Sequence, residues 1–225
     1  MKRIEKELKQ FDYNNCSLKL TLGVLVVVCL CTFLIVIATF TELSYSTQKL
    51  PVEAILHPIR FLTQSQNAWL FVLGYQYIPQ VPVILFIAAL LGRRFGSMSV
   101  LLYIILGLTV APIFALGGGL HYILEYNFGY ILSFLPAVII AGAILNSNIN
   151  IKNALKAAFF GVLTIHFIGV LYTTIVIIFK HDSFELFMNM IAIQSGIKII
   201  YDFIFSVFAI LIAKPVKKIL WLAMG

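Results

Sequence analysis

Six long stretches of mostly apolar residues constrain this sequence more than any other feature. Five carry no charge, at 20–41, 61–92, 95–124, 126–151 and 157–179, and the sixth ends at Ala213 with only Lys198 and Asp202 interrupting it. A hydrocarbon core of roughly 30 Å needs about 20 apolar residues per helix, so each stretch is long enough to cross a bilayer. With 61% hydrophobic residues, 11% charged residues and a mean hydropathy of +1.02, the chain lacks the composition of a water-soluble domain. We therefore predict an all-α membrane protein with six transmembrane helices.

The Lys and Arg residues are distributed unevenly between the two sides of these predicted helices. If the N-terminus is cytoplasmic, twelve of the sixteen lie inside: Lys2, Arg3, Lys6, Lys9, Lys19, Arg93, Arg94, Lys152, Lys156, Lys214, Lys217 and Lys218. Such an excess indicates the cytoplasmic side, so we predict a multi-pass protein of the cell membrane with both termini inside. The net charge of +7 then reflects orientation, and we set aside nucleic acid as a partner.

This orientation predicts how the chain is divided. We expect a basic cytoplasmic N-terminal segment at 1–19, a single transmembrane domain at 20–218 and a cytoplasmic end at 219–225. The first apolar run is too long for a signal-peptide core and lacks a cleavage pattern, so we expect it to be retained as a helix.

The outer connections are predicted to be long and irregular, at 44–80 and 112–127. They hold Pro79, Pro112 and the glycines at 117–119, which are turn signals. The inner connection at 92–96 is short by comparison. Irregular backbone near membrane depth is tolerated only where it is buried in protein or lines a cavity. We therefore expect the outer loops to cap a solute pocket.

Asp202 is the sharpest candidate for a binding residue. It lies twelve residues before Lys214, or about 18 Å along a helix, which places the carboxylate well inside the hydrocarbon. A charge at that depth costs roughly 2.5–3.5 kcal/mol on insertion scales and marks a functional site by default. Lys198 lies one turn before it, so two alternatives remain: the pair neutralises itself, or the carboxylate accepts hydrogen bonds from a solute while the ammonium meets a solute carboxylate.

Weaker candidates come from the outer ends of the helices. Gln80 lies between two prolines, and it lines the pocket or, with Tyr75 and Tyr77, belongs to an interfacial aromatic belt. Gly118 lies in a glycine run that forms a closely packed loop or a lid. Asn127 and Tyr130 open a helix whose N–H groups could meet an anion, although an ordinary N-cap also explains the Asn.

The remaining reactive side chains predict neither an enzyme nor a metal site. His166 lies in mid-span, where a hydrogen-bonded structural role is favoured over a ligand role. The three cysteines, Cys16, Cys29 and Cys31, lack the spacing of a disulfide framework or a metal site. No phosphate-binding loop, zinc-protease motif or nucleophile elbow is found. We expect no cofactor.

Several unusual motifs occur in a familiar order between Tyr75 and Gly142. They are Ile-Pro-Gln-Val-Pro at 78–82, Leu-Gly-Arg-Arg-Phe-Gly at 91–96, Ala-Pro-Ile-Phe-Ala-Leu-Gly-Gly-Gly at 111–119 and Phe-Gly-Tyr-Ile-Leu-Ser-Phe-Leu-Pro at 128–136. This order resembles the BioY family, the biotin-binding S-components of energy-coupling-factor transporters. The resemblance implies an S-component bundle, biotin as the substrate, and partnership with a transmembrane coupling subunit and two ATPases.

The resemblance also implies roles for residues near the end of the chain. The family has an acid near the start of the last helix and a lysine three residues later, both at the biotin site. Asp202 matches the acid, but Phe205 stands where the lysine is expected, and Lys198 is a possible substitute. The alternatives are an S-component for another vitamin and a small polytopic membrane enzyme or assembly factor.

Overall fold

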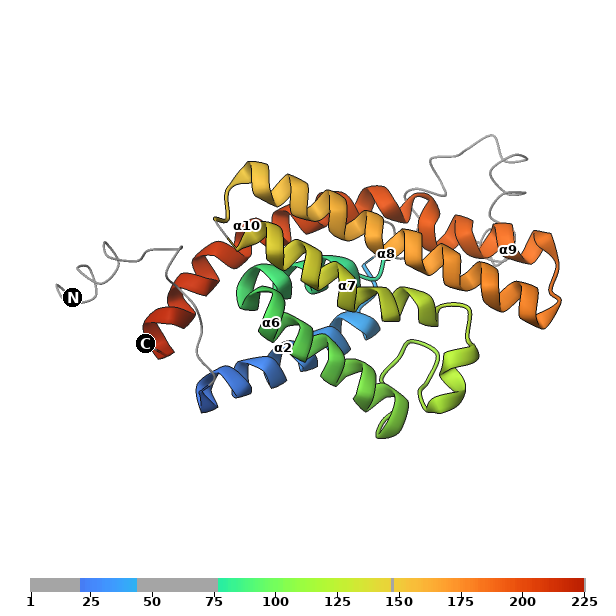
Figure 1. Cartoon of the computed structure of the whole chain (residues 1–225), viewed down its shortest axis with the longest axis horizontal. Coiled ribbons are helices and arrows are strands. Elements are labelled where there is room, and N and C mark those ends of the chain that lie inside the picture. The colour runs from blue at the N-terminus through green and yellow to red at the C-terminus, as the bar shows by residue number, and fades with distance from the viewer. Residues whose placement is uncertain (1–20, 44–76, 147, 225) are drawn as a thin grey trace.

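The computed structural model describes residues 21–43, 77–146 and 148–224 of the chain, with side chains described as far as Leu220 (Figure 1). The helices are α2 (Leu22–Phe40), α6 (Gln80–Thr109), α7 (Phe128–Leu145), α8 (Ile151–Lys180), α9 (Phe184–Ile191) and α10 (Lys198–Met224). Two short elements join them, the 3-10 helix η1 (Leu120–Leu124) and the π-helix η2 (Ala192–Gly196). The predicted basic segment at 1–19 and most of the predicted outer loop at 44–80 lie outside the described residues.

The described part of the chain is helical and apolar, as predicted. Beyond two isolated bridges it forms no strand. By length and composition, five helices are suited to cross a membrane: α2, α6, α7, α8 and the continuous run of α9, η2 and α10. The expected class of a helical membrane protein is therefore confirmed, whereas the count of six spans stays a prediction.

Helix α6 bends back on itself at Gly92, within the short inner connection predicted from the sequence. Gly92 has a φ of 71° and a ψ of −175°, a conformation that favours glycine. A Cβ on Gly96 would lie 3.5 Å from the carbonyl oxygen of Ile87, although nine residues of straight helix rise about 13 Å. The two halves of α6 therefore pack against each other, and the bend is visible in Figure 1.

Helix α8 begins six residues earlier than its uncharged stretch at 157–179. The side chain of Asn150 accepts a hydrogen bond from the Asn153 amide at 2.8 Å and caps the helix. Lys152 and Lys156 therefore lie within the first turns of α8, exposed on its surface. A capping residue, and not the first charge, sets the start of this helix.

Helices α7 and α8 pack closely because each has a glycine that faces a tyrosine of the other. The ring of Tyr130 in α7 lies over Gly169 in α8, and Tyr172 in α8 lies over Gly129 in α7. A methyl group on either glycine would overlap the facing ring. This reciprocal fit fixes the position of Tyr130, which contributes to the site described below.

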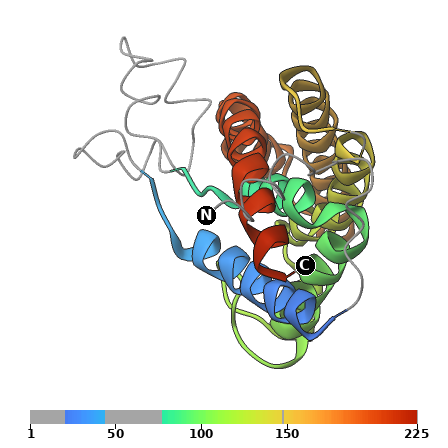
Figure 2. The same cartoon turned by 90° about the vertical axis from the view of Figure 1, so that its left-hand side faces the viewer.

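The ends of the helices gather at two sides of the molecule. In Figure 1 the start of α2, the bend of α6, the start of α8 and the end of α10 lie toward the left, and the turn between α8 and α9 lies toward the right. Figure 2 shows the left-hand side, where the C-terminus lies. These left-hand ends carry Arg93, Arg94, Lys152 and the lysines of the last turns of α10. The grouping agrees with the predicted inner face, while the orientation itself stays a prediction.

Candidate solute-binding site

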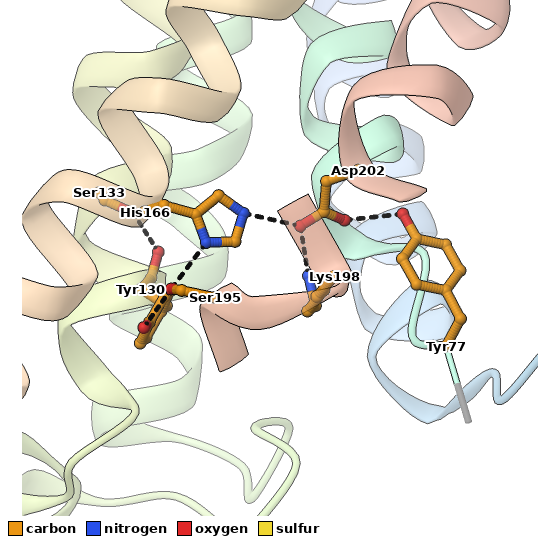
Figure 3. A network of polar contacts seen from close by, with 7 residues as sticks. All are labelled: Tyr77, Tyr130, Ser133, His166, Ser195, Lys198 and Asp202. Atoms are coloured by element: carbon orange, nitrogen blue, oxygen red, sulfur yellow. Dashed lines mark hydrogen bonds and ion pairs between the residues drawn. The ribbon is translucent and has the colours of Figure 1, made fainter. Parts of the chain in front are cut away.

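Asp202 lies in the second turn of α10 and is completely buried. Three side chains from different parts of the chain donate hydrogen bonds to its carboxylate (Figure 3). Lys198 Nζ and His166 Nε2 reach Oδ2 at 2.6 and 3.0 Å, and the Tyr77 hydroxyl reaches Oδ1 at 2.7 Å. A carboxylate inside an apolar bundle is stabilised only by such partners.

Lys198 and Asp202 form an ion pair within one turn of α10. The ammonium also lies 5.6 Å from the centre of the Tyr77 ring, and the Lys198 side chain is 14% exposed. The mutual neutralisation considered from the sequence is therefore present. The ammonium lies at the edge of the cluster. Among the described side chains that form ion pairs with Asp202, Lys198 is more exposed than His166, at 14% against 5%.

His166 links α8 to the carboxylate on one side and to η2 on the other. Its Nδ1 lies 2.8 Å from Ser195 Oγ, and Ser195 Oγ lies 2.7 Å from the hydroxyl of Tyr130. Ser133 Oγ in turn donates to the Tyr130 backbone carbonyl. The hydrogen-bonded role expected for His166 is thus confirmed, and the cluster extends from α10 through α8 and η2 to α7 (Figure 3).

Tyr77 brings an aromatic surface to the carboxylate. It lies three residues before the start of α6, and its backbone exchanges two hydrogen bonds of 2.8 Å with Leu43, which follows α2. Its ring centre lies 5.7 Å from that of Tyr201 and 5.2 Å from that of Phe205. Carboxylate, ammonium and three aromatic rings therefore meet at one place.

The cluster contains three of the six predicted site residues, namely Asp202, Lys198 and Tyr130. Gln80 lies in a separate group, where its amide donates to Thr39 Oγ1 at 2.7 Å and lies 3.5 Å from the Tyr103 hydroxyl. The hydroxyl oxygens of Thr39 and Tyr103 are themselves 3.0 Å apart, so this group joins α2 to both halves of the folded α6.

Asn127 and Gly118 have other neighbours. Asn127 is the N-cap residue of α7, as the plainer of the two interpretations predicted, but its side chain makes no capping hydrogen bond. Gly118 packs by its backbone, and a Cβ there would lie 2.7 Å from both the Gly107 carbonyl oxygen and Pro112 Cα. The close-packed loop considered for the glycine run is confirmed at this position.

Sequence reasoning missed Ser195 and undervalued Tyr77. No periodicity marks a serine that faces a histidine 29 residues away, because the contact depends on the π-helix η2. No sequence signal marked Ser195, because the π-helical turn that places it is visible only in the structure. Such turns often occur at functional sites. Tyr77 was grouped with Gln80 and Tyr75, and this group fitted an interfacial aromatic belt as well as a pocket wall.

The arrangement can hold a solute that carries both hydrogen-bond donors and an anionic group. A carboxylate accepts about four hydrogen bonds, and three positions on Asp202 are already used. Among the described residues, no group of three or more His, Cys, Asp and Glu side chains could hold a metal. The fold and the cluster define a polytopic helical membrane protein with a charged polar cluster buried inside its helical bundle.

The chain belongs to the BioY family, whose sequence profile matches residues 67–221. It is 29% identical over 157 residues to a protein of Lysinibacillus sphaericus described as "Probable biotin transporter BioY", covering 63% of this chain and 76% of that protein. Its fold is similar to the 2.1 Å crystal structure of the S-component for biotin from an ECF-type ABC transporter. The TM-score is 0.59 at 19% identity, with 89% of this chain and 95% of that chain covered. The resemblance stated from the motifs at 78–136 is confirmed.

Proposed function

We propose that this protein takes up biotin as the high-affinity substrate-binding membrane subunit of an energy-coupling-factor transporter. The observation that carries the proposal is Asp202, a fully buried carboxylate surrounded by donors in a chain of the BioY family. Its partners would be a transmembrane coupling subunit and two ATPases, which supply the energy, and the protein would be multi-pass with both termini cytoplasmic. The solved S-component with a similar fold, by its description from an ECF-type transporter, supports this assembly.

Biotin offers groups that match the cluster. The N–H groups of its ureido ring would donate to Asp202, and Oδ1 is the oxygen with the fewer donors. The fused rings would pack against Tyr77, Tyr201 and Phe205, which already contact one another. Aromatic faces of this kind bury a flat apolar solute efficiently.

Lys198 is the group proposed for the biotin carboxylate. Phe205, where the family resemblance implies a lysine, is 42% exposed and packs on Tyr77, so it offers a surface but no charge. The Lys198 ammonium lies one turn before Asp202 and is partly exposed. Gln80, Asn127, Tyr130 and Gly118 are proposed as further lining of the pocket.

A binding measurement on the purified protein tests the proposal. We expect submicromolar biotin affinity by isothermal titration. Asp202→Asn should lower this affinity at least about 100-fold, because the amide loses the charge-assisted hydrogen bonds and its NH₂ group faces the buried donors Tyr77, His166 and Lys198. Asp182→Asn is the matched control, since Asp182 also bonds a tyrosine, Tyr126, but lies in the turn after α8. The absence of biotin binding by the wild type contradicts the proposal.

Another vitamin is the second candidate substrate. A buried acid with an ammonium and aromatic rings would also suit other flat, hydrogen-bonding solutes. Competition separates the candidates: thiamine or riboflavin displacing a bound probe where biotin does not would transfer the assignment to that vitamin. A membrane enzyme is disfavoured because the family is one whose described relatives are transporter components.

A further inference from the structure

Ser195 lies between Tyr130 and His166, and His166 in turn contacts the Asp202 carboxylate. Its Oγ is 2.7 Å from the Tyr130 hydroxyl and 2.8 Å from His166 Nδ1, while His166 Nε2 is 3.0 Å from Asp202 Oδ2 (Figure 3). Ser195 and His166 are 8% and 5% exposed, so water does not compete freely for these bonds.

The direction of each hydrogen bond follows from the carboxylate. Asp202, paired with the Lys198 ammonium at 2.6 Å, only accepts hydrogen bonds. His166 Nε2 must therefore carry a proton and donate it to Oδ2. In a neutral imidazole, Nδ1 is then an acceptor, so Ser195 donates to it and in turn accepts from Tyr130.

We propose that Tyr130, Ser195 and His166 form a positioning relay that holds His166 in its Nε2–H tautomer. The relay keeps Asp202 Oδ2 with the protein and leaves Oδ1, which accepts from the Tyr77 hydroxyl, as the oxygen that the solute reaches. The relay rests on the proposed function, because it assigns Oδ2 to the protein and Oδ1 to the biotin ureido group. With Lys198 and His166 on Oδ2, the carboxylate cannot rotate without losing both bonds. The residues of the relay are positioning residues and do not themselves contact the solute through these atoms.

The fold supports this relay at both ends. The Tyr130 ring is held over Gly169 of α8, so its hydroxyl has a fixed direction toward Ser195. Ser195 lies in η2, where the π-helical turn interrupts the α-helical pattern just before α10. Outer groups that orient a histidine commonly fix its tautomer, as they do at metal sites.

The tautomer can be measured in the ligand-free protein. In histidine-labelled protein, with the signal assigned by His166→Gln, ¹⁵N NMR should show His166 protonated at Nε2 alone. Ser195→Ala should produce a mixture of tautomers, and Ser99→Ala should not, because Ser99 is a buried serine that bonds its own helix at Phe95. An Nδ1–H tautomer in the wild type, or no change in Ser195→Ala, overturns the relay.

Biotin affinity tests whether the relay serves binding. Ser195→Ala should weaken affinity about tenfold, as expected for loss of one buried hydrogen bond, while Ser195→Thr should restore it and Ser99→Ala should leave it unchanged. Wild-type affinity in Ser195→Ala contradicts the proposal, and so does a loss that Ser195→Thr does not restore. If the wild type does not bind biotin, the proposed function fails, whereas the tautomer measurement still decides the relay.

Discussion

The phenol of Tyr77 donates to Asp202 Oδ1 at 2.7 Å and joins two residues that are 125 positions apart in the chain. This bond occupies the carboxylate oxygen that the proposed solute would use. Tyr77 is 4% exposed and Asp202 is not exposed at all, so the described conformation has the cluster closed over its own carboxylate. A solute donor must therefore replace the phenol or share Oδ1 with it.

Tyr77→Phe should tighten biotin binding and destabilise the ligand-free protein. Removal of the hydroxyl leaves Oδ1 without its donor, which costs about 1–3 kcal/mol in the ligand-free state. A ureido N–H then restores the missing bond, so affinity should rise up to about tenfold. Titration calorimetry and thermal unfolding with and without biotin measure the two effects.

Tyr122→Phe serves as the control for this substitution. Tyr122 lies in η1, is 1% exposed and packs against Phe114 and Phe128, which are not part of the Asp202 cluster. It should leave affinity unchanged. Weaker binding in Tyr77→Phe would show instead that the phenol contacts the solute.

Lys198→Met should lower the affinity for biotin more than the affinity for biotin methyl ester. The ester lacks the carboxylate that the ammonium is proposed to meet, so its affinity should depend on Lys198 only through Asp202. The variant should also unfold at lower temperature, because removing one partner of a buried pair costs about 3–5 kcal/mol. Titration with both compounds separates the two effects.

The second half of this experiment concerns Phe205. In the Lys198→Met background, Phe205→Lys should recover part of the biotin affinity, since position 205 is 42% exposed and one turn from Asp202. Equal losses for biotin and its ester would remove Lys198 from the carboxylate-binding role.

The sequence predicted the membrane class and the central acid because both depend on local composition. Long apolar runs specify helices in a bilayer, and the depth of Asp202 follows from counting residues along one of them. The folded α6 was also predictable from the short basic connection at 92–96. The full polar cluster was not, because Tyr77, His166 and Ser195 come from three elements whose mutual register is set by packing.

The helix boundaries also differ in how far they could be predicted, because some are set by local side-chain bonds and others by packing between elements. Asn150 caps α8 by a local side-chain bond, although charge-based segmentation had placed the apolar stretch six residues later. The π-helix η2 and its exact register have no comparable sequence signal, yet they bring Ser195 to His166.

Gly169→Ala should disturb the site through Tyr130. The added methyl would overlap the Tyr130 ring, and overpacking of this kind costs about 1–3 kcal/mol. Displacement of the ring should also break its bond to Ser195, so biotin affinity should fall along with the unfolding temperature. Gly196→Ala is the matched control, because nothing lies within 4 Å of a Cβ at that glycine. Unchanged affinity in Gly169→Ala would show that the Tyr130 ring is not required in this position.

The turn between α8 and α9 provides a test of the structure outside the Asp202 cluster. The Tyr126 hydroxyl donates to Asp182 at 2.6 Å, and the Lys180 ammonium lies 4.2 Å from the centre of the Tyr126 ring. The hydrogen bond to the carboxylate, followed by partial burial, raises the pKa of Tyr126 from 10.0 to about 12. Because the folded-state pKa is the higher one, this contact stabilises the fold below pH 10 and is lost as the pH rises toward 12.

Asp182→Asn should therefore lower the pKa of Tyr126 toward its ordinary value. The difference in tyrosinate absorbance between each protein and its Tyr126→Phe counterpart isolates this one group among the ten tyrosines. Lys180→Gln is the opposing control, because removal of a cation near the ring should not lower the pKa of the phenol. If Tyr126 titrates at the same pH in the wild type and in the Asp182→Asn variant, then the hydrogen bond from Tyr126 to Asp182 does not join the start of α7 to the end of α8.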